Sequence, residues 1–302
     1  MTTPAIAVNS LVRTFGHTRA LDDFSMTVET GEVRGFLGPN GSGKSTTIRI
    51  LLGMIRADSG EARVLDMDPW KDSVALHNRI AYVAGDTALW PNLTGGETID
   101  LLTRHRTGMG VRKRKSELLE RFELDPTKKT RTYSKGNRQK VALVAALCSD
   151  ADVYFLDEPT SGLDPLMEVI FQDEVRQLSQ TGKTVLLSSH ILGEVEKLCD
   201  TVTIIRSGHD VLSGPLSQLR HLTRSTVTAI LPETSDHVAQ LEEVHDYTRE
   251  GEQISFHIDD QDIGAVLPHL LDQSVRNLTI TPPSLEDMFL QHYGDDPAKS
   301  ES

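Results

Sequence analysis

Short apolar runs alternate with segments of helical periodicity along the first two thirds of the chain. A short apolar run bounded by turn-forming residues predicts a buried strand, and apolar residues three or four apart predict an amphipathic helix. Short strands are expected over 5–37, of which the last is 33–37. The later strands are 80–83, 153–156, 184–188 and 202–205, and the helices are 44–55, 98–147, 166–178 and 191–198. This alternation indicates an α/β fold with a largely parallel central sheet.

The pattern changes past about residue 222, where strands and helices are predicted in the order β-α-β-β-α-β. That order is typical of a small ferredoxin-like α+β domain. The predicted elements are strand 226–231, helix 235–244, strands 245–248 and 252–258, helix 262–273 and strand 275–281. A final helix is expected over 284–293, and the polar tail 295–302 is expected to be disordered.

The 302 residues carry a net charge of −13, which is unevenly distributed. Residues 222–302 contain 16 acidic and 4 basic residues, so nearly all the excess negative charge lies there. We therefore expect a nearly neutral domain over 1–221 and an acidic accessory domain over 222–294. The acidic total argues against nucleic acid as a partner.

One basic stretch runs against this trend, because residues 104–140 contain 13 bases and only 4 acids. A solvated charged helix face is the ordinary interpretation. The alternative is a surface that contacts anionic lipid, which attracts each basic side chain by about 1 kcal/mol. The net charge of the chain therefore does not exclude an anionic membrane as a partner.

Cysteine usage and hydropathy point to a cytosolic protein. Cys148 and Cys199 lie in apolar helical contexts and form no CxxC pair, which is typical of buried free thiols in a reducing compartment. No apolar run approaches the roughly 20 residues that cross a bilayer, and the N-terminus shows no signal peptide.

A glycine-rich loop between the predicted strand 33–37 and the following helix matches the pattern GxxxxGK[ST]. Glycines let successive backbone N–H groups face phosphate oxygens, and the helix N-terminus adds a favourable dipole. Lysine in this motif reaches the β- and γ-phosphates, and the next hydroxyl ligates Mg²⁺. The loop therefore predicts binding of a nucleoside triphosphate by Gly38, Pro39, Asn40, Gly41, Ser42, Gly43, Lys44, Ser45 and Thr46.

Acidic residues follow the apolar strand 153–156. Asp157 at the carboxyl end of a parallel strand is placed to hold Mg²⁺ opposite the phosphate loop. The adjacent Glu158 can polarise an attacking water, which favours hydrolysis. His190 ends the next predicted strand, where a contact with the γ-phosphate is geometrically feasible.

A second anion site is predicted at the start of the helix that ends near residue 147. Ser134 is a typical N-cap, and a helix N-terminus beside glycine binds anions. By itself the segment Ser134, Lys135, Gly136 and Asn137 is only a helix cap. Its position between the phosphate loop and Asp157 favours the functional interpretation.

Together these residues resemble the ATP-binding subunit of an ABC transporter over about residues 5–220. The matching motifs are Walker A at 38–45, the signature at 134–137, Walker B at 153–158, the D-loop at 161–164 and the switch histidine His190. The resemblance implies a RecA-like P-loop NTPase core with an antiparallel β subdomain and a helical subdomain at about 90–150. It also implies that Phe15 stacks on adenine, Ser45 and Asp157 hold Mg²⁺, and Glu158 is the general base.

By the same resemblance, two subunits, expected as a homodimer, pack head to tail around two ATP molecules. The signature residues then act on the partner subunit's ATP, His190 senses the γ-phosphate, and Asp164 contacts the partner.

Two positions depart from the family pattern. The signature reads Tyr-Ser-Lys-Gly-Asn instead of Leu-Ser-Gly-Gly-Gln, so Lys135 adds a positive charge. The family places a glutamine after a strand like 80–83, and Gly85 occupies that position here. Asp86 is a candidate Mg²⁺ ligand in its place, and the alternative is that water fills the gap.

Two shorter matches concern transport. The segments 91–97 and 283–289 resemble stretches of the exporter branch that includes daunorubicin- and tetronasin-type exporters. This resemblance implies export of a drug or antibiotic-like molecule through a separate membrane permease, from the cytoplasmic face of the cell membrane. The alternative is a soluble ABC-type ATPase that acts as a regulator, in DNA repair or in translation. The chain has neither the coiled-coil insertion nor the second cassette of the repair and translation classes.

Overall fold

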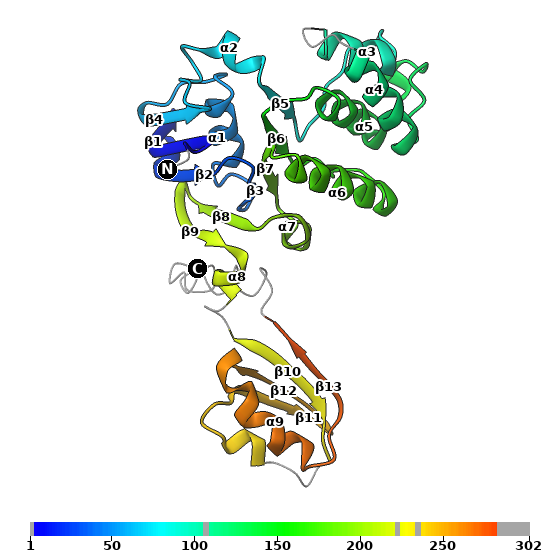
Figure 1. Cartoon of the computed structure of the whole chain (residues 1–302). Helices are drawn as coiled ribbons and strands as arrows, with labels where there is room; N and C mark the ends of the chain where they lie inside the picture. Colours follow the sequence, from blue (N-terminus) through cyan, green and yellow to red (C-terminus); the bar gives the residue numbers. More distant parts are fainter. Residues whose placement is uncertain (1–2, 105–108, 221–223, 233–236, 283–302) are drawn as a thin grey trace. The chain divides into compact units, whose positions relative to one another are not determined.

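The structure is a computed structural model that describes residues 3–104, 109–220, 224–232 and 237–282. The chain divides into two compact units, Met1–Gly214 and Pro215–Ser302 (Figure 1). Each unit has its own sheets and its own hydrophobic core.

A six-stranded sheet forms the centre of the first unit. Its strands are β3 (Val33–Leu37), β5 (Ile80–Val83), β6 (Val153–Asp157), β7 (Thr184–Ser189), β8 (Thr201–Arg206) and β9 (His209–Pro215). They lie in the order β5-β6-β7-β3-β8-β9, and the pairs from β5 through β8 are parallel. Strands β3, β6 and β7 are buried along their whole length, which explains their short, mostly apolar sequences. The predicted α/β fold is confirmed, and β9 is a strand that the pattern did not predict.

A three-stranded antiparallel sheet packs beside the central sheet. It consists of β1 (Ile6–Phe15), β2 (Thr18–Val28) and β4 (Ser59–Val64), in the order β2-β1-β4. The rings of Phe24 in β2 and Phe36 in β3 lie 5.6 Å apart between centroids. Helix α1 (Lys44–Leu51) contributes Ile48 to the same core cluster. The antiparallel subdomain thereby supports the loop between β3 and α1.

Helix α1 is shorter than the predicted 44–55. It ends because Gly53 has a φ of 66°, in the left-handed region that favours glycine. The N–H of Gly53 bonds to Ile50 O and that of Met54 bonds to Arg49 O, both at 2.9 Å. This pair of hydrogen bonds is a Schellman motif, which satisfies the last carbonyls of the helix.

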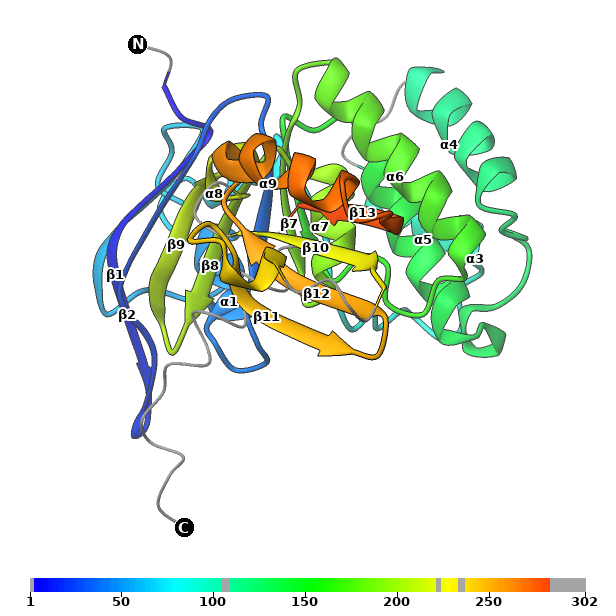
Figure 2. The same cartoon turned by 90° about the horizontal axis from the view of Figure 1, so that it is seen from below.

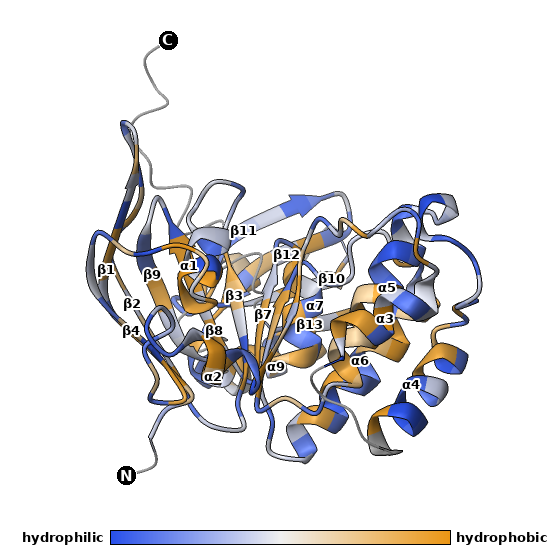
Figure 3. Ribbon diagram, turned by 90° about the horizontal axis from the view of Figure 1, so that it is seen from above, coloured by the Kyte–Doolittle hydropathy of each residue, from blue (hydrophilic) through white to orange (hydrophobic). Residues whose placement is uncertain are grey.

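Helices α3 (Gly95–Leu102), α4 (Met109–Arg121), α5 (Lys135–Leu147) and α6 (Pro165–Gln180) lie on the side away from β1 and β2 (Figure 2). The predicted helical segment 98–147 is therefore divided into three helices and the short 3₁₀ turn η1 (Thr130–Thr132). Two further helices, α2 (Ser73–His77) and α7 (Leu192–Leu198), are short. Figure 3 shows hydrophobic residues concentrated in the central sheet and many hydrophilic residues on α4.

A buried carboxylate joins α4 to α6. The side chain of Glu174 in α6 is 0% exposed, and it accepts hydrogen bonds from Arg114 and Arg121 of α4. The two guanidinium groups are about one-third exposed, at 30% and 33%. Two bases of the stretch 104–140 are therefore engaged in an internal ion cluster and are not part of a free charged face.

The second unit is an antiparallel sheet with one main helix. Its elements are α8 (Leu216–Arg220), β10 (Ser225–Ile230), η2 (His237–Gln240), β11 (His245–Glu250), β12 (Gln253–Ile258), η3 (Asp260–Asp262), α9 (Ile263–Leu271) and β13 (Arg276–Thr281). The strands lie in the order β11-β12-β10-β13. Val227, Phe256 and Val266 are buried between the sheet and α9. The four predicted strands and the second predicted helix are confirmed.

The predicted helix 235–244 is wrong in its described part. The structure has only the 3₁₀ turn η2, and residues 241–244 are not helical. Val238, Leu241 and Val244 face the core of this unit at intervals of three residues. Only Val238 lies in η2, and Leu241 and Val244 reach the core from the non-helical segment that follows it.

The expected terminal helix 284–293, the tail 295–302 and the exporter-like segment 283–289 lie outside the described residues. In the part of the chain that is described, no helix has both the length and the apolar character needed to cross a membrane.

The α4–α6 ion cluster yields a stability prediction. We expect Glu174→Ala to lower the free energy of unfolding of the first unit by about 2–3 kcal/mol, because it leaves two arginines without their shared buried partner. Urea unfolding followed by the fluorescence of Trp70 and Trp90, the only tryptophans and both in this unit, measures the change. Asp173→Ala, which removes a 46% exposed carboxylate on the same helix, is the control and should cost less than about 1 kcal/mol. Equal midpoints for the two variants would contradict this prediction.

Candidate active site

Three loops meet at one edge of the central sheet, because β6, β7 and β3 are neighbouring parallel strands. The phosphate loop 38–43 follows β3, Glu158 follows β6, and His190 follows β7. Carboxyl ends of neighbouring parallel strands point the same way, and such an edge is where α/β proteins bind ligands. The sequence predicted that Asp157 and His190 lie at strand ends facing the phosphate loop, and the strand order of the sheet brings these segments together.

Two of the three glycines of the phosphate loop, Gly38 and Gly43, have no room for a side chain. A Cβ on Gly38 would lie 2.3 Å from Ile205 O, and one on Gly43 would lie 2.6 Å from Ala20 O. Gly43 also has a φ of 118°, which residues other than glycine rarely adopt. The loop is therefore packed between β8 and β2, and its shape depends on glycine.

Two polar side chains are buried in this loop. Lys44 Nζ donates to Gly38 O at 2.5 Å and to Pro39 O at 3.1 Å. Burial lowers the pKa of the Lys44 ammonium, and the carboxylates of Glu158 and Asp157 act in the opposite direction. Ser42 Oγ is buried and has no hydrogen-bond partner among the described residues. A buried hydroxyl beside a buried cation suits a phosphate group, which accepts from both.

Asp157 lies between the phosphate loop and β7. Its Oδ2 accepts from Ser45 Oγ at 3.3 Å, and its Oδ1 accepts from Ser188 Oγ. Ser188 also pairs with Asp157 in the register of β6 and β7. Carboxylate and hydroxyl oxygens are the ligands that Mg²⁺ prefers, and one or two such protein ligands suffice when phosphates supply others. Ser45 and Asp157 thus fit the predicted metal site.

Glu158 and His190 are adjacent to each other. Glu158 Oε1 lies 3.2 Å from His190 Nδ1, and the two side chains are 28% and 55% exposed. Glu158 has a φ of 45°, and its N–H donates to Ser188 O at 3.0 Å. A left-handed conformation at a residue other than glycine persists only when the surroundings hold it. Both side chains can therefore reach a ligand at the phosphate loop from defined backbone positions.

The loop after β5 contacts Walker B, as expected for the position of the family's glutamine. A Cβ on Gly85 would lie 3.3 Å from Asp157 O and 3.4 Å from Glu158 Cβ. Asp86 is exposed, and the described structure contains no hydrogen bond or ion pair between Asp86 and Ser45 or Asp157. A role for Asp86 as a Mg²⁺ ligand stays a prediction.

The signature segment begins α5 and contacts the D-loop of the same chain. Ser134 is the N-cap, and its Oγ accepts from Asn137 N at 3.2 Å. Lys135 Nζ donates to Ser161 Oγ at 2.7 Å. A Cβ on Gly136 would lie 2.3 Å from Gly162 O, so only glycine fits at this close approach. The extra charge of Lys135 is thus held beside the D-loop.

Asp164 and Phe15 have local partners as well. Asp164 is the N-cap of α6, and its Oδ1 accepts from Met167 N at 3.1 Å. Phe15 at the end of β1 is 44% exposed, and the Arg13 guanidinium lies 4.6 Å from its ring centroid. The contact of Asp164 with a partner subunit and the stacking of Phe15 on adenine stay predictions.

This constellation agrees with comparisons to known proteins. Residues 21–161 match the family model described as ABC transporter, and residues 214–293 match that of the DrrA1-3-like ATP-binding protein, C-terminal domain. The daunorubicin resistance ATP-binding protein DrrA3 of Streptomyces coeruleorubidus is 37% identical over 224 residues, 73% of this chain and 71% of that protein. The chain belongs to the ATP-binding subunits of ABC transporters. This ABC subunit is an ATPase.

Solved structures of ABC proteins share its fold. The ATP-binding subunit of an ABC transporter matches with a TM-score of 0.69 and 28% identity, covering 73% of this chain and 93% of that one. A bacterial ABC transporter cassette solved as a dimer matches with a TM-score of 0.64 and 25% identity, covering 70% and 98%. The P-loop NTPase fold predicted for the ABC subunit is confirmed.

The sequence interpretation missed two buried polar residues beside the site. Glu194 in α7 accepts hydrogen bonds from Thr160 and Ser189, each at 3.0 Å, and so links the segment after Walker B to the switch loop. Gln139 in α5 bonds to Thr87 and to Pro159. The sequence offered only a weak signal for these residues. Each is a polar residue on the helix face whose other residues are buried in the core.

Glu194 yields a pH prediction for the ABC subunit. Burial raises the pKa of the Glu194 carboxyl above its ordinary 4.5. Protonation therefore favours the folded state, and this contribution is full below pH 4.5 and is lost as the pH rises through the folded-state pKa. We expect Glu194→Gln to gain stability relative to the wild type between pH 4.5 and neutral pH, as measured by urea unfolding across that range.

Glu242→Gln, which removes an exposed carboxylate, controls for the loss of one negative charge. A constant difference in unfolding free energy between Glu194→Gln and the wild type at every pH would contradict the prediction.

Proposed function

We propose that this ABC ATPase dimerises around two ATP molecules and powers export of a small, drug- or antibiotic-like molecule through a separate membrane permease. The observation that carries the catalytic part is the meeting of the phosphate loop, Asp157, Glu158 and His190 at one sheet edge. The drug-resistance names of relatives such as DrrA3 support the cargo class.

The roles within the site follow from the side chains present. Residues 38–46 would hold the phosphates of ATP through backbone N–H groups, Lys44 and the Ser42 hydroxyl. Ser45 and Asp157 would hold Mg²⁺, which when bound neutralises charge that develops on the phosphate oxygens. Glu158 accepts a proton from the attacking water, and His190 orients the Glu158 carboxylate from 3.2 Å.

The partner-facing residues would be Ser134, Lys135, Gly136 and Asn137 at the start of α5, with Asp164 of the D-loop. The N-terminus of α5 presents unpaired N–H groups and a positive dipole end, to which the phosphates of a partner's ATP are complementary. The dimeric state of the related cassette supports this arrangement. We propose a homodimer, with Phe15 stacked on adenine in each subunit.

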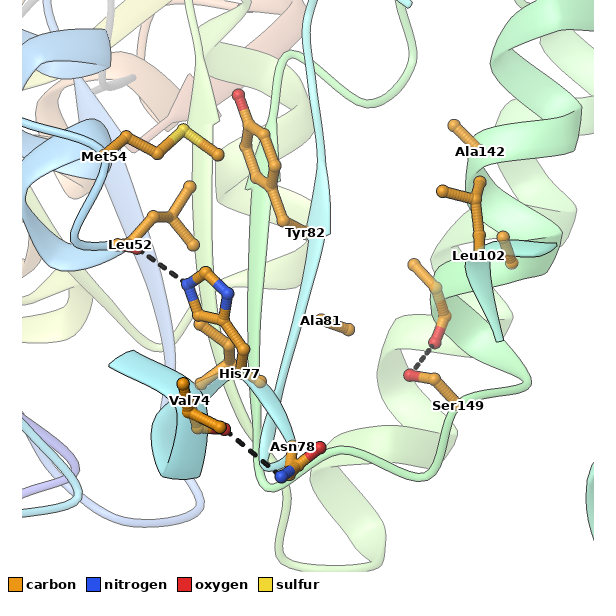
Figure 4. Close-up of a pocket in the computed structure, with 13 residues that line it drawn as sticks. Leu52, Met54, Val74, His77, Asn78, Ala81, Tyr82, Leu102, Ala142 and Ser149 are labelled. Atoms are coloured by element: carbon orange, nitrogen blue, oxygen red, sulfur yellow. Dashed lines mark hydrogen bonds between the residues drawn. The ribbon is translucent and has the colours of Figure 1, made fainter. Parts of the chain in front are cut away.

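An apolar groove in the first unit supports a permease as partner. The groove has a volume of about 610 Å³ and lies between β5 and α2 on one wall and α3 and α5 on the other. In Figure 4, Leu52, Met54 and Tyr82 lie across from Leu102 and Ala142. Its lining is mostly apolar, which suits an amphipathic segment of a membrane protein. The chain would then sit at the cytoplasmic face of the cell membrane as a peripheral subunit.

The second unit would be the acidic accessory domain, for which we propose a role in stabilising the dimer or regulating it. A chain that ends at Gly214, where the first unit ends, tests this role. Dimerisation, ATP hydrolysis and export at the level of the full chain would refute it.

Hydrolysis itself tests the assignment of Glu158. We expect Glu158→Gln to lower the rate of phosphate release by about 100- to 10,000-fold, because the amide cannot accept the proton of water. Affinity for ATP, measured with a fluorescent analogue, should stay within about twofold, since the phosphate loop is unchanged. Asp173→Asn on α6 is the control and should hydrolyse ATP as the wild type does. A Glu158→Gln variant with wild-type turnover would refute the proposed mechanism.

The exposed bases of α4 test the membrane side. Arg112 and Lys113 are exposed, and Lys113 has only a 3.8 Å ion pair with Glu117 on the same helix. Arg114 bonds to Glu174 and Lys115 bonds to Asp100, so neutralising Arg112 and Lys113 leaves these contacts between helices intact. We expect Arg112→Gln with Lys113→Gln to weaken binding to anionic liposomes about 30-fold, at about 1 kcal/mol for each charge.

The matched control, Arg63→Gln with Lys71→Gln, removes two exposed charges near the antiparallel sheet and should bind as the wild type does. The same three proteins, the wild type and the two double variants, are compared for copurification with the permease. If both double variants behave like the wild type in both assays, the basic residues of α4 do not contact the membrane.

A further inference from the structure

A single buried amide connects the two loops that flank Glu158. Gln139 lies in α5 and is 1% exposed. Its Nε2 donates to Pro159 O at 3.1 Å, and its Oε1 accepts from Thr87 Oγ1 at 2.7 Å. The amide nitrogen thus meets a carbonyl and the amide oxygen meets a hydroxyl, so both ends of the side chain are satisfied.

One of these partners is the residue directly after Glu158. The Glu158 backbone lies in the left-handed region, at a φ of 45°. The hydrogen bond from Gln139 Nε2 to Pro159 O restrains the backbone of the next residue. On its other side, the Glu158 N–H is anchored to Ser188 O in β7. The Glu158 carbonyl accepts from Ser161 N at 3.2 Å. Gln139 adds a side-chain hydrogen bond from α5 to this strained backbone segment, which carries the proposed general base.

The other partner lies in the loop after β5. Thr87 follows Gly85, whose Cα faces Asp157 O and Glu158 Cβ, so this loop packs directly on Walker B. The family's glutamine is absent from position 85, and no side chain of Gly85 can hold Walker B from this side. The hydrogen bond between Thr87 and Gln139 fixes the loop against α5 instead.

We infer that Gln139 is a positioning residue for ATP hydrolysis, which keeps Glu158 in place by bonding to Pro159 and to the loop that packs against Glu158. The inference rests on the proposed role of Glu158 as general base. Gln139 touches neither ATP nor water in this role. Displacing a catalytic group by about 1 Å can cost about 100-fold in rate, so loss of this support affects turnover more than binding.

The test compares a variant that removes both hydrogen bonds of Gln139 with variants of its partner Thr87. Gln139→Met keeps the volume and removes both bonds of the amide. Thr87→Val removes the bond between Thr87 and Gln139, together with the 3.2 Å bond from Thr87 Oγ1 to Ala84 O, and Thr87→Ser retains the hydroxyl that makes both. Steady-state phosphate release gives kcat and KM, a fluorescent ATP analogue gives affinity, and urea unfolding verifies folding. Gln177→Met, at an exposed position of α6, is the matched control.

We expect Gln139→Met to lower kcat about 30- to 100-fold with the affinity for ATP within about twofold. Thr87→Val should lower kcat by less, and Thr87→Ser should restore it to near the wild type. In the double variant Thr87→Val with Gln139→Met, kcat should equal that of Gln139→Met, because both changes remove the same contact. Should Gln139→Met fail to fold, Thr87→Val and Thr87→Ser still decide the matter.

Wild-type kcat in a folded Gln139→Met or, if that variant does not fold, in Thr87→Val would overturn the inference. A parallel loss of kcat and ATP affinity would overturn it too, because that result indicates a purely structural role. Glu158→Gln separates this failure from failure of the proposed function. If Glu158→Gln is inactive while Gln139→Met turns over normally, only the role of Gln139 is refuted. If Glu158→Gln is itself fully active, the proposed function is refuted as well.

Discussion

The site depends on the parallel register of β6 and β7, which places Ser188 directly opposite Asp157. Ser188 Oγ donates a hydrogen bond to Asp157 across this pair of strands. Because β3 pairs with β7 on the other side, the three loops that follow these strands emerge at one edge. The strands are buried along their length, so they cannot shift register without exposing apolar side chains. A rigid sheet edge thereby places a phosphate loop, two carboxylates and a histidine within reach of one ligand.

Buried polar side chains tie the surrounding helices to this edge. Glu194 connects α7 to Thr160, Gln139 connects α5 to Pro159, and Glu174 connects α6 to α4. Leaving any of these groups without a partner in the interior costs about 1–3 kcal/mol. These buried hydrogen bonds fix the position of each helix relative to the element that it contacts. Apolar contacts alone are less specific, because they tolerate small sliding movements between the two elements.

The sequence predicted the central strands well, since burial on both faces makes them short apolar runs such as 33–37 and 80–83. The sequence pattern predicted helix ends and short helical segments less well, because tertiary contacts there outweigh local preference. Helix α1 stops at a Schellman motif with Gly53, which periodicity alone does not show. The segment 235–244 has apolar residues three apart, but in its described part only the 3₁₀ turn His237–Gln240 is helical, and Leu241 and Val244 reach the core from a non-helical segment. Strand β9 carries too few apolar residues to be predicted, and helix α2, with five residues, is too short to show a helical period.

The sequence by itself determined the motifs, because each is a contiguous segment whose chemistry is local: the glycines and lysine of the phosphate loop, the acidic pair after β6, and the helix cap at Ser134. The folded chain then decided which residues support them. Gln139 bonds to partners 52 and 20 residues away in sequence, and Glu194 bonds to Thr160 across 34 residues. Such pairings follow from strand order and helix packing, so no local pattern reveals them. The tertiary structure also distinguishes the bases of α4 that form ion pairs with other helices from those that are exposed, because only some of them lie next to an acidic residue of a neighbouring helix.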